Sequence, residues 1–211
     1  MKKYLKFLFA ATCAVALHSC SYTYMARYEV GLSAVIQPQG TEEGQITAIM
    51  SRDSTMRYTY ENSDILASWV VTHRTLALQL LNRGASTIKM NTDDMCFVDY
   101  EGAASRVMNA ELPLAQRNAI QPTITVPAGS YTNVAVIPTC NIQGGQVVNL
   151  VPSYYKDYDA MMSGGPKYVG KTLQMLVPLH IGGQLKEYLF IFTLDKFLPE
   201  AQFELPSPVR Y

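Results

Sequence analysis

Apolar and polar residues alternate through most of the chain, and the dominant period is two. In Ile65–Val71 the residues Ile65, Ala67 and Trp69 fall on one side, and Leu76–Asn82 resumes the alternation after a polar interruption. A period of two is typical of a β-strand with one buried face, so the two segments predict a β-hairpin. Trp69, the only tryptophan, is expected to face the core.

Further segments of the same kind follow one another at short spacing. The other expected strands lie at 45–50, 56–61, 87–90, 95–100, 105–109, 124–127, 131–138, 172–181 and 185–195. Segments 76–81 and 185–194 are apolar on both faces, which is typical of strands inside a sheet, and Pro178 predicts an edge or a bulge. Many short strands separated by turn residues predict an all-β fold, an antiparallel sandwich or barrel. One short helix is expected at 154–162, with Ser153 as its N-cap and Gly164 just past its end.

The first twenty residues, MKKYLKFLFAATCAVALHSC, are organised like a secretory signal. Three lysines precede an apolar run at 7–17, which is too short to span a bilayer and has the length of a signal-peptide core. The run ends in LHSC and resembles a bacterial lipobox, with an aliphatic residue at −3, a small residue at −1 and Cys20 at +1. The resemblance implies cleavage before Cys20, diacylglycerol on its thiol and acylation of the new amino terminus.

The residues around Cys20 also bear on location. Two or three acyl chains give stable attachment, because each buried CH₂ contributes about 0.8 kcal/mol. Ser21 rather than aspartate follows the cysteine, and by resemblance to Gram-negative sorting rules this favours the outer membrane. No acidic cluster follows Cys20, so we expect the protein to face the periplasm. The expected division is a signal peptide at 1–19, a lipidated N-terminus with a tether or first strand at 20–44, a β-sandwich domain at 45–197 and a tail at 198–211.

Charge and cysteine content change this picture little. The chain has 17 basic and 17 acidic side chains, and removing residues 1–19 takes away three lysines. The remainder is too close to neutral to indicate binding of nucleic acid or of an acidic membrane surface.

Cys13 leaves with the signal peptide, so Cys96 and Cys140 remain in a compartment that permits disulfides. Each lies in or just after an apolar β-like segment, and two interpretations stay open: two buried free thiols, or a Cys96–Cys140 disulfide.

The segment GPKYVGKT, residues 165–172, matches the phosphate loop G-x-x-x-x-G-K-[ST] letter for letter. A phosphate loop joins a buried strand to the N-terminus of a helix, which binds the anion. Here a polar segment precedes the motif and a strand-like segment follows it. We therefore expect no nucleotide binding, with Gly165 and Gly170 as turn residues and with Lys171 and Thr172 at the start of a strand.

No motif for a catalytic elbow, a zinc helix or an EF-hand occurs in the sequence. His73 in an expected turn and His180 on an outward position are interpreted as surface histidines. Asp93-Asp94 and Asp157/Asp159 are interpreted as turn and helix-start carboxylates, with weak calcium binding as the alternative. The sequence thus predicts no catalytic residue, no cofactor and no metal site.

The most suggestive group of side chains is aromatic and consists of Tyr154, Tyr155, Tyr158 and Tyr168, interleaved with lysine and aspartate. Tyrosine combines apolar area with a polar tip, which suits protein interfaces and sugar stacking. These residues predict an interaction surface. The alternative is that this long connection packs over the open end of the sandwich.

Five segments together carry a resemblance to a known family: YENSDILASWV, LQLLNRGASTIKM, FVDYEGAASRVMN, VPAGS and YVGKTLQMLVPLHIGGQLKEYLFIF. They look like a family of uncharacterised lipoproteins common in Bacteroidota, over roughly residues 58–197. The resemblance implies an immunoglobulin-like β-sandwich and no known activity, and Asn109 stands where the family often has histidine. We expect a lipid-anchored, non-catalytic binding or structural module, whose partners are the membrane and an envelope protein or glycan. The alternative is a surface-displayed adhesin or glycan-binding component, and an enzyme ranks third.

Overall fold

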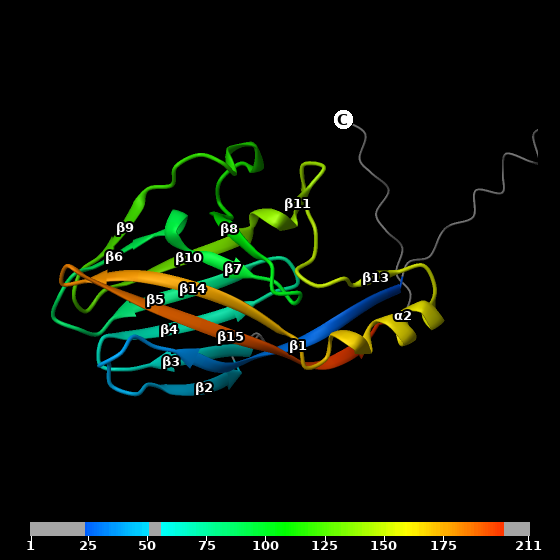
Figure 1. The fold of residues 1–211 in the computed structure, drawn as a ribbon, viewed down its shortest axis with the longest axis horizontal. Helices are drawn as coiled ribbons and strands as arrows, with labels where there is room; N and C mark the ends of the chain where they lie inside the picture. Colours follow the sequence, from blue (N-terminus) through cyan, green and yellow to red (C-terminus); the bar gives the residue numbers. More distant parts are fainter. Residues whose placement is uncertain (1–23, 51–55, 201–211) are drawn as a thin grey trace, which may run out of the picture.

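The computed structural model describes residues 24–50 and 56–200, which are mostly β-strands (Figure 1). Thirteen strands join into one sheet, all of whose pairings are antiparallel, and two more form a small separate hairpin. The strands are β1 (Tyr24–Ile36), β2 (Gln45–Met50), β3 (Met56–Glu61), β4 (Ile65–Val71), β5 (Leu76–Asn82), β6 (Ile88–Asn91), β7 (Cys96–Val98), β8 (Ala104–Asn109), β9 (Thr123–Val126), β10 (Tyr131–Pro138), β11 (Ile142–Gln143), β12 (Gln146–Val147), β13 (Tyr154–Tyr155), β14 (Thr172–Ile181) and β15 (Gln184–Pro199). The expected antiparallel all-β class is confirmed.

The helical segments are short. They are the α-helix α2 (Tyr158–Gly164) and the 3-10 turns η1 (Thr92–Asp94), η2 (Leu114–Gln116), η3 (Thr139–Asn141) and η4 (Pro166–Tyr168). Within the described ranges, none of these helices has the length and apolar character needed to cross a membrane.

The sheet curls so that its two halves face each other across the core. Eleven of its strands follow the order β13-β1-β15-β14-β7-β8-β10-β5-β4-β3-β2, and beside this path β6 pairs with β14 and β9 pairs with β6. β8 joins the halves, because residues 104–106 pair with β7 and residues 107–109 pair with β10. Trp69 of β4 packs against Phe190 and Phe192 of β15, with ring centroids 5.1 and 5.5 Å apart. The backbone pairing is thus continuous from one half to the other, and an immunoglobulin-like sandwich of two separate sheets is not confirmed.

The central hairpin forms as its alternation predicts. β4 and β5 have the expected boundaries and pair from Ile65↔Asn82 to Val71↔Leu76. The predicted inward side of β4 is buried, with Ile65, Ala67 and Trp69. Leu76, Leu78 and Leu80, which alternate along one face of β5, are buried as well. β5 lies between β4 and β10, and β15 lies between β1 and β14, so the two strands that are apolar on both faces are central ones.

The N-terminal part of the described chain is a strand of the sheet. β1 pairs with β15 from Ala26↔Pro199 to Ile36↔Leu189, with register shifts after Glu29 and Leu32. Of the two expectations for residues 20–44, a tether or a first strand, the described part takes the second. The sheet therefore begins at Tyr24, ahead of the expected domain start at residue 45, and β15 continues past residue 197 to Pro199.

Pro178 lies in the middle of the sheet rather than at its edge. β14 pairs with β15 along its whole length. On its other side, residues 174–176 pair with β7 and residues 179–181 pair with β6. Pro178 falls in the interval between these two partners, where the ladder needs no amide donor from it.

The expected helix start at residue 154 is wrong. α2 begins at Tyr158, because the Asp157 side chain caps it by accepting a hydrogen bond from the Ala160 amide at 2.7 Å. The hydroxyl of Ser153, the predicted cap, instead donates to the Val151 carbonyl at 2.8 Å. Residues 154–155 gain sheet partners as β13, which pairs with the first residues of β1.

Candidate ligand pocket and interaction surface

The connection between β10 and β14 closes one end of the curled sheet (Figure 1). Two backbone bonds fix it there: the Leu150 amide donates to the His73 carbonyl at 2.8 Å, and the Ala26 amide donates to the Ser153 carbonyl at 2.7 Å. The first bond ties the connection to the turn between β4 and β5, and the second ties it to β1. These bonds support the second interpretation of the tyrosine-rich connection, in which it packs over the open end of the sheet.

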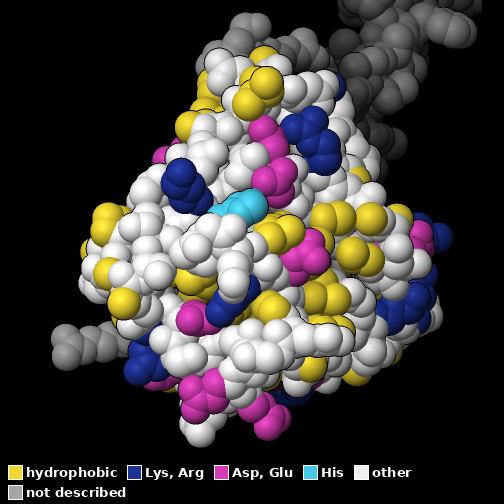
Figure 2. Space-filling model, turned by 60° about the vertical axis from the view of Figure 1, so that its left-hand side comes forward, with side chains coloured by type: hydrophobic (Ala, Val, Ile, Leu, Met, Phe, Trp, Pro, Cys, Tyr) yellow, Lys and Arg dark blue, Asp and Glu magenta, His cyan; other side chains and the backbone are white. Residues whose placement is uncertain are grey.

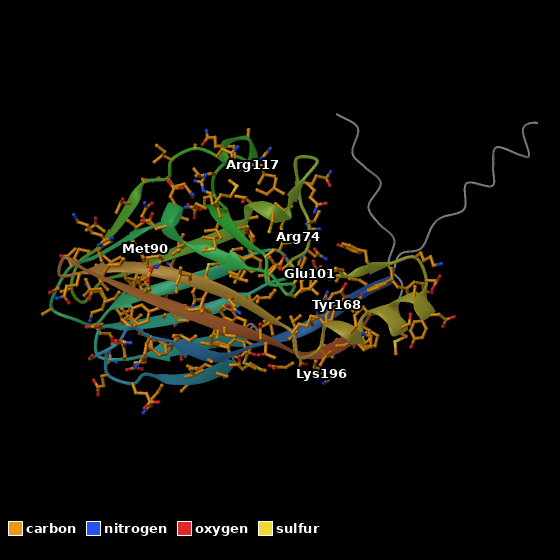
Figure 3. The ribbon with its side chains drawn as sticks, viewed as in Figure 1. Arg74, Met90, Glu101, Arg117, Tyr168 and Lys196 are labelled. Carbon is orange, nitrogen blue, oxygen red and sulfur yellow. The ribbon has the colours of Figure 1, made fainter. Side chains whose placement is uncertain are left out.

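Tyr168 belongs to this packing and not to an outer surface. Its ring is buried and meets the rings of Tyr28 and Tyr100 edge-on, with centroids 6.0 and 5.1 Å apart. Figure 3 shows Tyr168 close to Glu101, which follows Tyr100 in the turn between β7 and β8. The Tyr28 hydroxyl donates to the Gly165 carbonyl at 3.2 Å, and burial raises the pKa of Tyr28 well above its ordinary value. The prediction of Tyr168 as an interaction residue is therefore wrong, because the core needs its ring.

The other three predicted tyrosines divide between packing and surface. Tyr155 is half-buried, and its hydroxyl donates to the Pro152 carbonyl at 3.4 Å. Tyr154 and Tyr158 are exposed, by 43% and 50%. The structure thus brings all four residues to one end of the molecule, but only Tyr154 and Tyr158 present their side chains to solvent.

A cavity of about 340 Å³ lies beneath the connection. Its walls are mostly apolar, and its lining residues are Ala26, Arg27, Tyr28, Val30, Val71, Thr72, His73, Leu150, Val151, Ser153, Leu173 and Leu194. The volume falls at the small end of ligand pockets, which hold about 300–1,000 Å³. Sequence reasoning missed this pocket because its residues come from separate segments of the chain and form no local motif.

The lining residues with polar side chains are Arg27, Tyr28, Thr72, His73 and Ser153. The Arg27 guanidinium forms an ion pair with Glu200 at 2.8 Å. Burial, and then the charges of Arg74 and Arg27, hold the pKa of His73 below its ordinary value of 6.5.

The serine and threonine hydroxyls of the pocket bond to their own local backbone. The Ser153 hydroxyl donates to the Val151 carbonyl, and the Thr72 hydroxyl donates to the Thr75 carbonyl at 3.2 Å. Neither hydroxyl thus donates to His73, as a nucleophile would donate to its base. The arrangement suits the binding of a small, largely apolar molecule beside the Arg27 cation better than a reaction on it.

The phosphate-loop match folds as a turn followed by a strand. The Gly170 amide donates to the Leu194 carbonyl at 2.9 Å, and the Lys171 amide donates to the Tyr168 carbonyl at 3.1 Å. Gly170 has a positive φ of 82°, and β14 begins at Thr172. In a phosphate loop such amides donate to the bound anion, whereas here they donate to backbone carbonyl groups of the protein. The interpretation of this segment as turn and strand start is confirmed.

Nucleotide should therefore leave the stability of the protein unchanged. A ligand that binds only the folded state stabilises it by about 2.7 kcal/mol at a hundredfold excess over Kd. We expect millimolar Mg-ATP or Mg-GTP to cause no shift in Tm, measured by thermal denaturation of the wild type. Lys171→Ala should be nearly neutral, since its ammonium only lies over the Tyr100 ring, 5.8 Å from the centroid. A rise in Tm with nucleotide that Lys171→Ala abolishes would contradict this reading.

Cys96 and Cys140 are free thiols, so the disulfide interpretation is not what the structure shows. Cys140 accepts a hydrogen bond from the Ser105 hydroxyl at 3.2 Å, whereas Cys96 pairs across the sheet with Arg106. Successive residues of β8 point to opposite faces, so the two thiols lie on opposite sides of this strand. The expectation of two buried thiols is also wrong, because Cys96 is half-buried and Cys140 is exposed outside the sheet.

The candidate carboxylates have structural partners. Asp93 accepts hydrogen bonds from the Gln121 amide at 2.9 Å and from Arg106 at 2.9 Å. The pKa of Asp93 is held below its ordinary value of 3.8, first by the bond from the Gln121 backbone. Asp157 caps α2, as the helix-start interpretation requires. In the part of the chain that the structure describes, no group of three or more His, Cys, Asp or Glu could hold a metal ion.

Basic and acidic side chains are interspersed on the face of the molecule shown in Figure 2, and no broad area of one sign stands out there. His180 is exposed on β14, as its outward position predicts. This face therefore gives no indication of binding to a polyanion.

No protein-family model matches the chain, and no curated protein matches it. A solved structure described as "X-ray structure of Northeast Structural Genomics Consortium target SoR45" aligns with 88% of this chain and 91% of its own, at 13% sequence identity. The TM-score of that alignment is 0.26, which is too low to carry an argument about fold or function. The resemblance to Bacteroidota lipoproteins therefore remains a hypothesis.

Proposed function

We propose that the protein is a lipid-anchored lipoprotein of the cell envelope, attached to the outer membrane and facing the periplasm, where it acts as a non-catalytic binding or structural module. The observation that carries the proposal is the spacing between anchor and fold. The lipobox resemblance ends at Cys20, and β1 begins at Tyr24, four residues later. Because β1 pairs with the central strand β15, a lipid on Cys20 would be joined almost directly to the sheet.

The pocket beneath the connection supports the binding role. Its apolar walls and its volume of about 340 Å³ suit a small apolar molecule. The pocket walls include Leu173 of β14 and Leu194 of β15, and β14 pairs with β15 along its whole length. A site built on such strands keeps its shape without a ligand.

A surface-displayed adhesin or glycan-binding component is the second candidate. The exposed Tyr154 and Tyr158 favour it, because tyrosine rings stack on sugars and contribute strongly to protein interfaces. Protease treatment of intact cells separates the two candidates, since it releases the protein only if the protein is displayed outside. An enzyme ranks third.

Replacing Cys20 with alanine should abolish lipid attachment and leave an unprocessed precursor. The thiol of Cys20 is the proposed acceptor of diacylglycerol, and cleavage in front of it follows that step. Labelling of growing cells with a fatty acid, followed by gel analysis of the precipitated protein, measures both effects. Cys13→Ala is the matched control, because this cysteine lies within the apolar run of the signal and should be dispensable. Label retained by Cys20→Ala, or a wild-type protein that matures without lipid, would show that the lipobox assignment is wrong.

A further inference from the structure

Exposed apolar side chains gather at one end of the molecule, on the segment that contains β13 and α2. Tyr154, Tyr158 and Met162 are exposed by 43%, 50% and 39%, and we refer to these three residues as the α2 surface. Tyr158 and Met162 are four residues apart in the helix, so they share one of its faces. The α2 surface is therefore a small apolar area presented to solvent.

The α2 surface lies beside the start of β1. The Tyr158 ring contacts the Tyr24 ring edge-on, with centroids 6.0 Å apart, and Tyr154 pairs with Met25 in the sheet. Figure 1 shows β13 and α2 next to the beginning of β1, at the same end of the sheet. The α2 surface thus lies beside Tyr24, the described residue that is nearest to Cys20 in the chain.

The length of chain between Cys20 and Tyr24 limits how far this end can be from the lipid. The two residues are four positions apart, and an extended chain spans at most about 3.6 Å per residue. Tyr24 therefore lies within about 14 Å of the residue that would carry the acyl chains. Since those chains enter the bilayer directly from Cys20, the first turn of α2 lies within reach of the lipid headgroups.

The chemistry of the α2 surface suits that environment. Tyrosine is enriched where a membrane meets water, because its ring enters the headgroup layer and its hydroxyl stays hydrated. Lys156 lies between Tyr154 and Tyr158 in the chain, Lys167 follows Met162, and both lysines are exposed. Lysine can extend its ammonium toward lipid phosphates. The Lys156 ammonium is also 3.7 Å from the Asp157 carboxylate, so the local charge is nearly balanced. This composition fits a phospholipid surface that is largely zwitterionic.

We infer that the α2 surface lies in the headgroup region of the phospholipid leaflet that holds the lipid anchor. The inference rests on the proposed lipidation of Cys20 and gives the anchored domain a fixed orientation. In this orientation β1 rises from the membrane, and the lining of the cavity begins at Ala26, two residues beyond Tyr24. The pocket then lies close to the leaflet, where apolar molecules are available.

A tryptophan placed on the α2 surface tests this orientation. The lipidated protein is reconstituted in phosphatidylethanolamine and phosphatidylglycerol vesicles whose acyl chains carry bromine, which quenches nearby indole emission. Tyr158→Trp is compared with Tyr131→Trp, an equally aromatic position that is 62% exposed and pairs with Leu81, near the end of β5 away from the connection. The native Trp69 is buried and supplies the same background in both variants. We expect the added emission of Tyr158→Trp to be quenched at least twofold more than that of Tyr131→Trp.

The other outcomes overturn the inference in distinguishable ways. Equal quenching at both positions, in protein shown by mass to carry lipid, would overturn the orientation and leave the proposed anchor intact. Protein purified from the membrane without lipid on Cys20 would overturn the proposed function and the orientation together. A far-ultraviolet circular dichroism spectrum and a Tm like those of the wild type confirm that each variant is folded, so neither result can be ascribed to unfolding.

Discussion

Replacing Trp69 with alanine should lower the free energy of unfolding by about 3–5 kcal/mol. The indole is fully buried in β4 and packs against Phe190 and Phe192 of β15, so it fills the space between the two halves of the sheet. Alanine would leave a cavity that Phe190 and Phe192 can fill only in part, because the pairing of β15 with β1 and β14 holds them in place. Domains are typically stable by about 5–15 kcal/mol, so the loss is a large share of the total. Denaturant unfolding followed by circular dichroism measures it.

Trp69→Phe is the matched control for this substitution. Phenylalanine keeps most of the aromatic packing and removes the indole N–H, which is buried and has no hydrogen-bond partner within the described chain. We therefore expect it to lose less than half of what alanine loses. In the wild type, the emission of Trp69 should be blue-shifted and should move to longer wavelength on unfolding. A native emission already typical of water, with a nearly silent alanine variant, would contradict the buried position.

The parts of the fold that the sequence predicts well are those in which neighbours in the chain are neighbours in space. The β4–β5 hairpin follows from the alternation around Trp69, because a one-residue slip would move every buried side chain to the outer face. The β14–β15 hairpin follows in the same way, with Gly182 and Gly183 at positive φ in its turn. These local signals are sufficient to give the antiparallel all-β class.

The parts that the sequence did not predict depend on contacts between distant segments. The pairing of β1 with β15 joins the two ends of the described chain, and no periodicity within either strand identifies its partner. The same holds for β8, whose two halves pair with different strands and so join the halves of the sheet. Pro178 is an example. Its presence in a strand predicts an interruption of the pairing, but that interruption lies between the separate partners β6 and β7, which the sequence does not identify.

The candidate site shows the same division. The tyrosines of the connection are visible in the sequence as a cluster, yet their spacing does not reveal which rings are buried. Tyr168 is buried because Tyr28 and Tyr100 arrive from other strands, whereas Tyr158 remains on an exposed helix face. The pocket is still less visible, since Arg27 and His73 become neighbours only when the sheet closes.

Asn82→Ala is the second substitution for which we expect a large loss of stability, about 2–4 kcal/mol. Asn82 ends β5 and is fully buried. A buried asparagine side chain normally needs hydrogen-bond partners. Its amide nitrogen donates to the Ser86 carbonyl at 2.8 Å and to the Val126 carbonyl at 2.9 Å, and its side-chain oxygen accepts from the Gly84 amide at 3.1 Å. One side chain thus holds the turn after β5 against the end of β9.

Alanine would leave the two carbonyls without these donors, and each unpaired buried polar group costs about 1–3 kcal/mol. For a chain of this length we expect Tm to fall by roughly 5–15 °C, as measured by differential scanning calorimetry. Asn133→Ala is the matched control, because that asparagine is exposed on β10 and only accepts a bond from the Gln79 side chain at 3.0 Å. It should change stability by less than about 0.5 kcal/mol. Equal losses in the two variants would mean that the buried bonds of Asn82 do not hold these turns together, and that the packing of β5 against β4 and β10 alone fixes this end of the sheet.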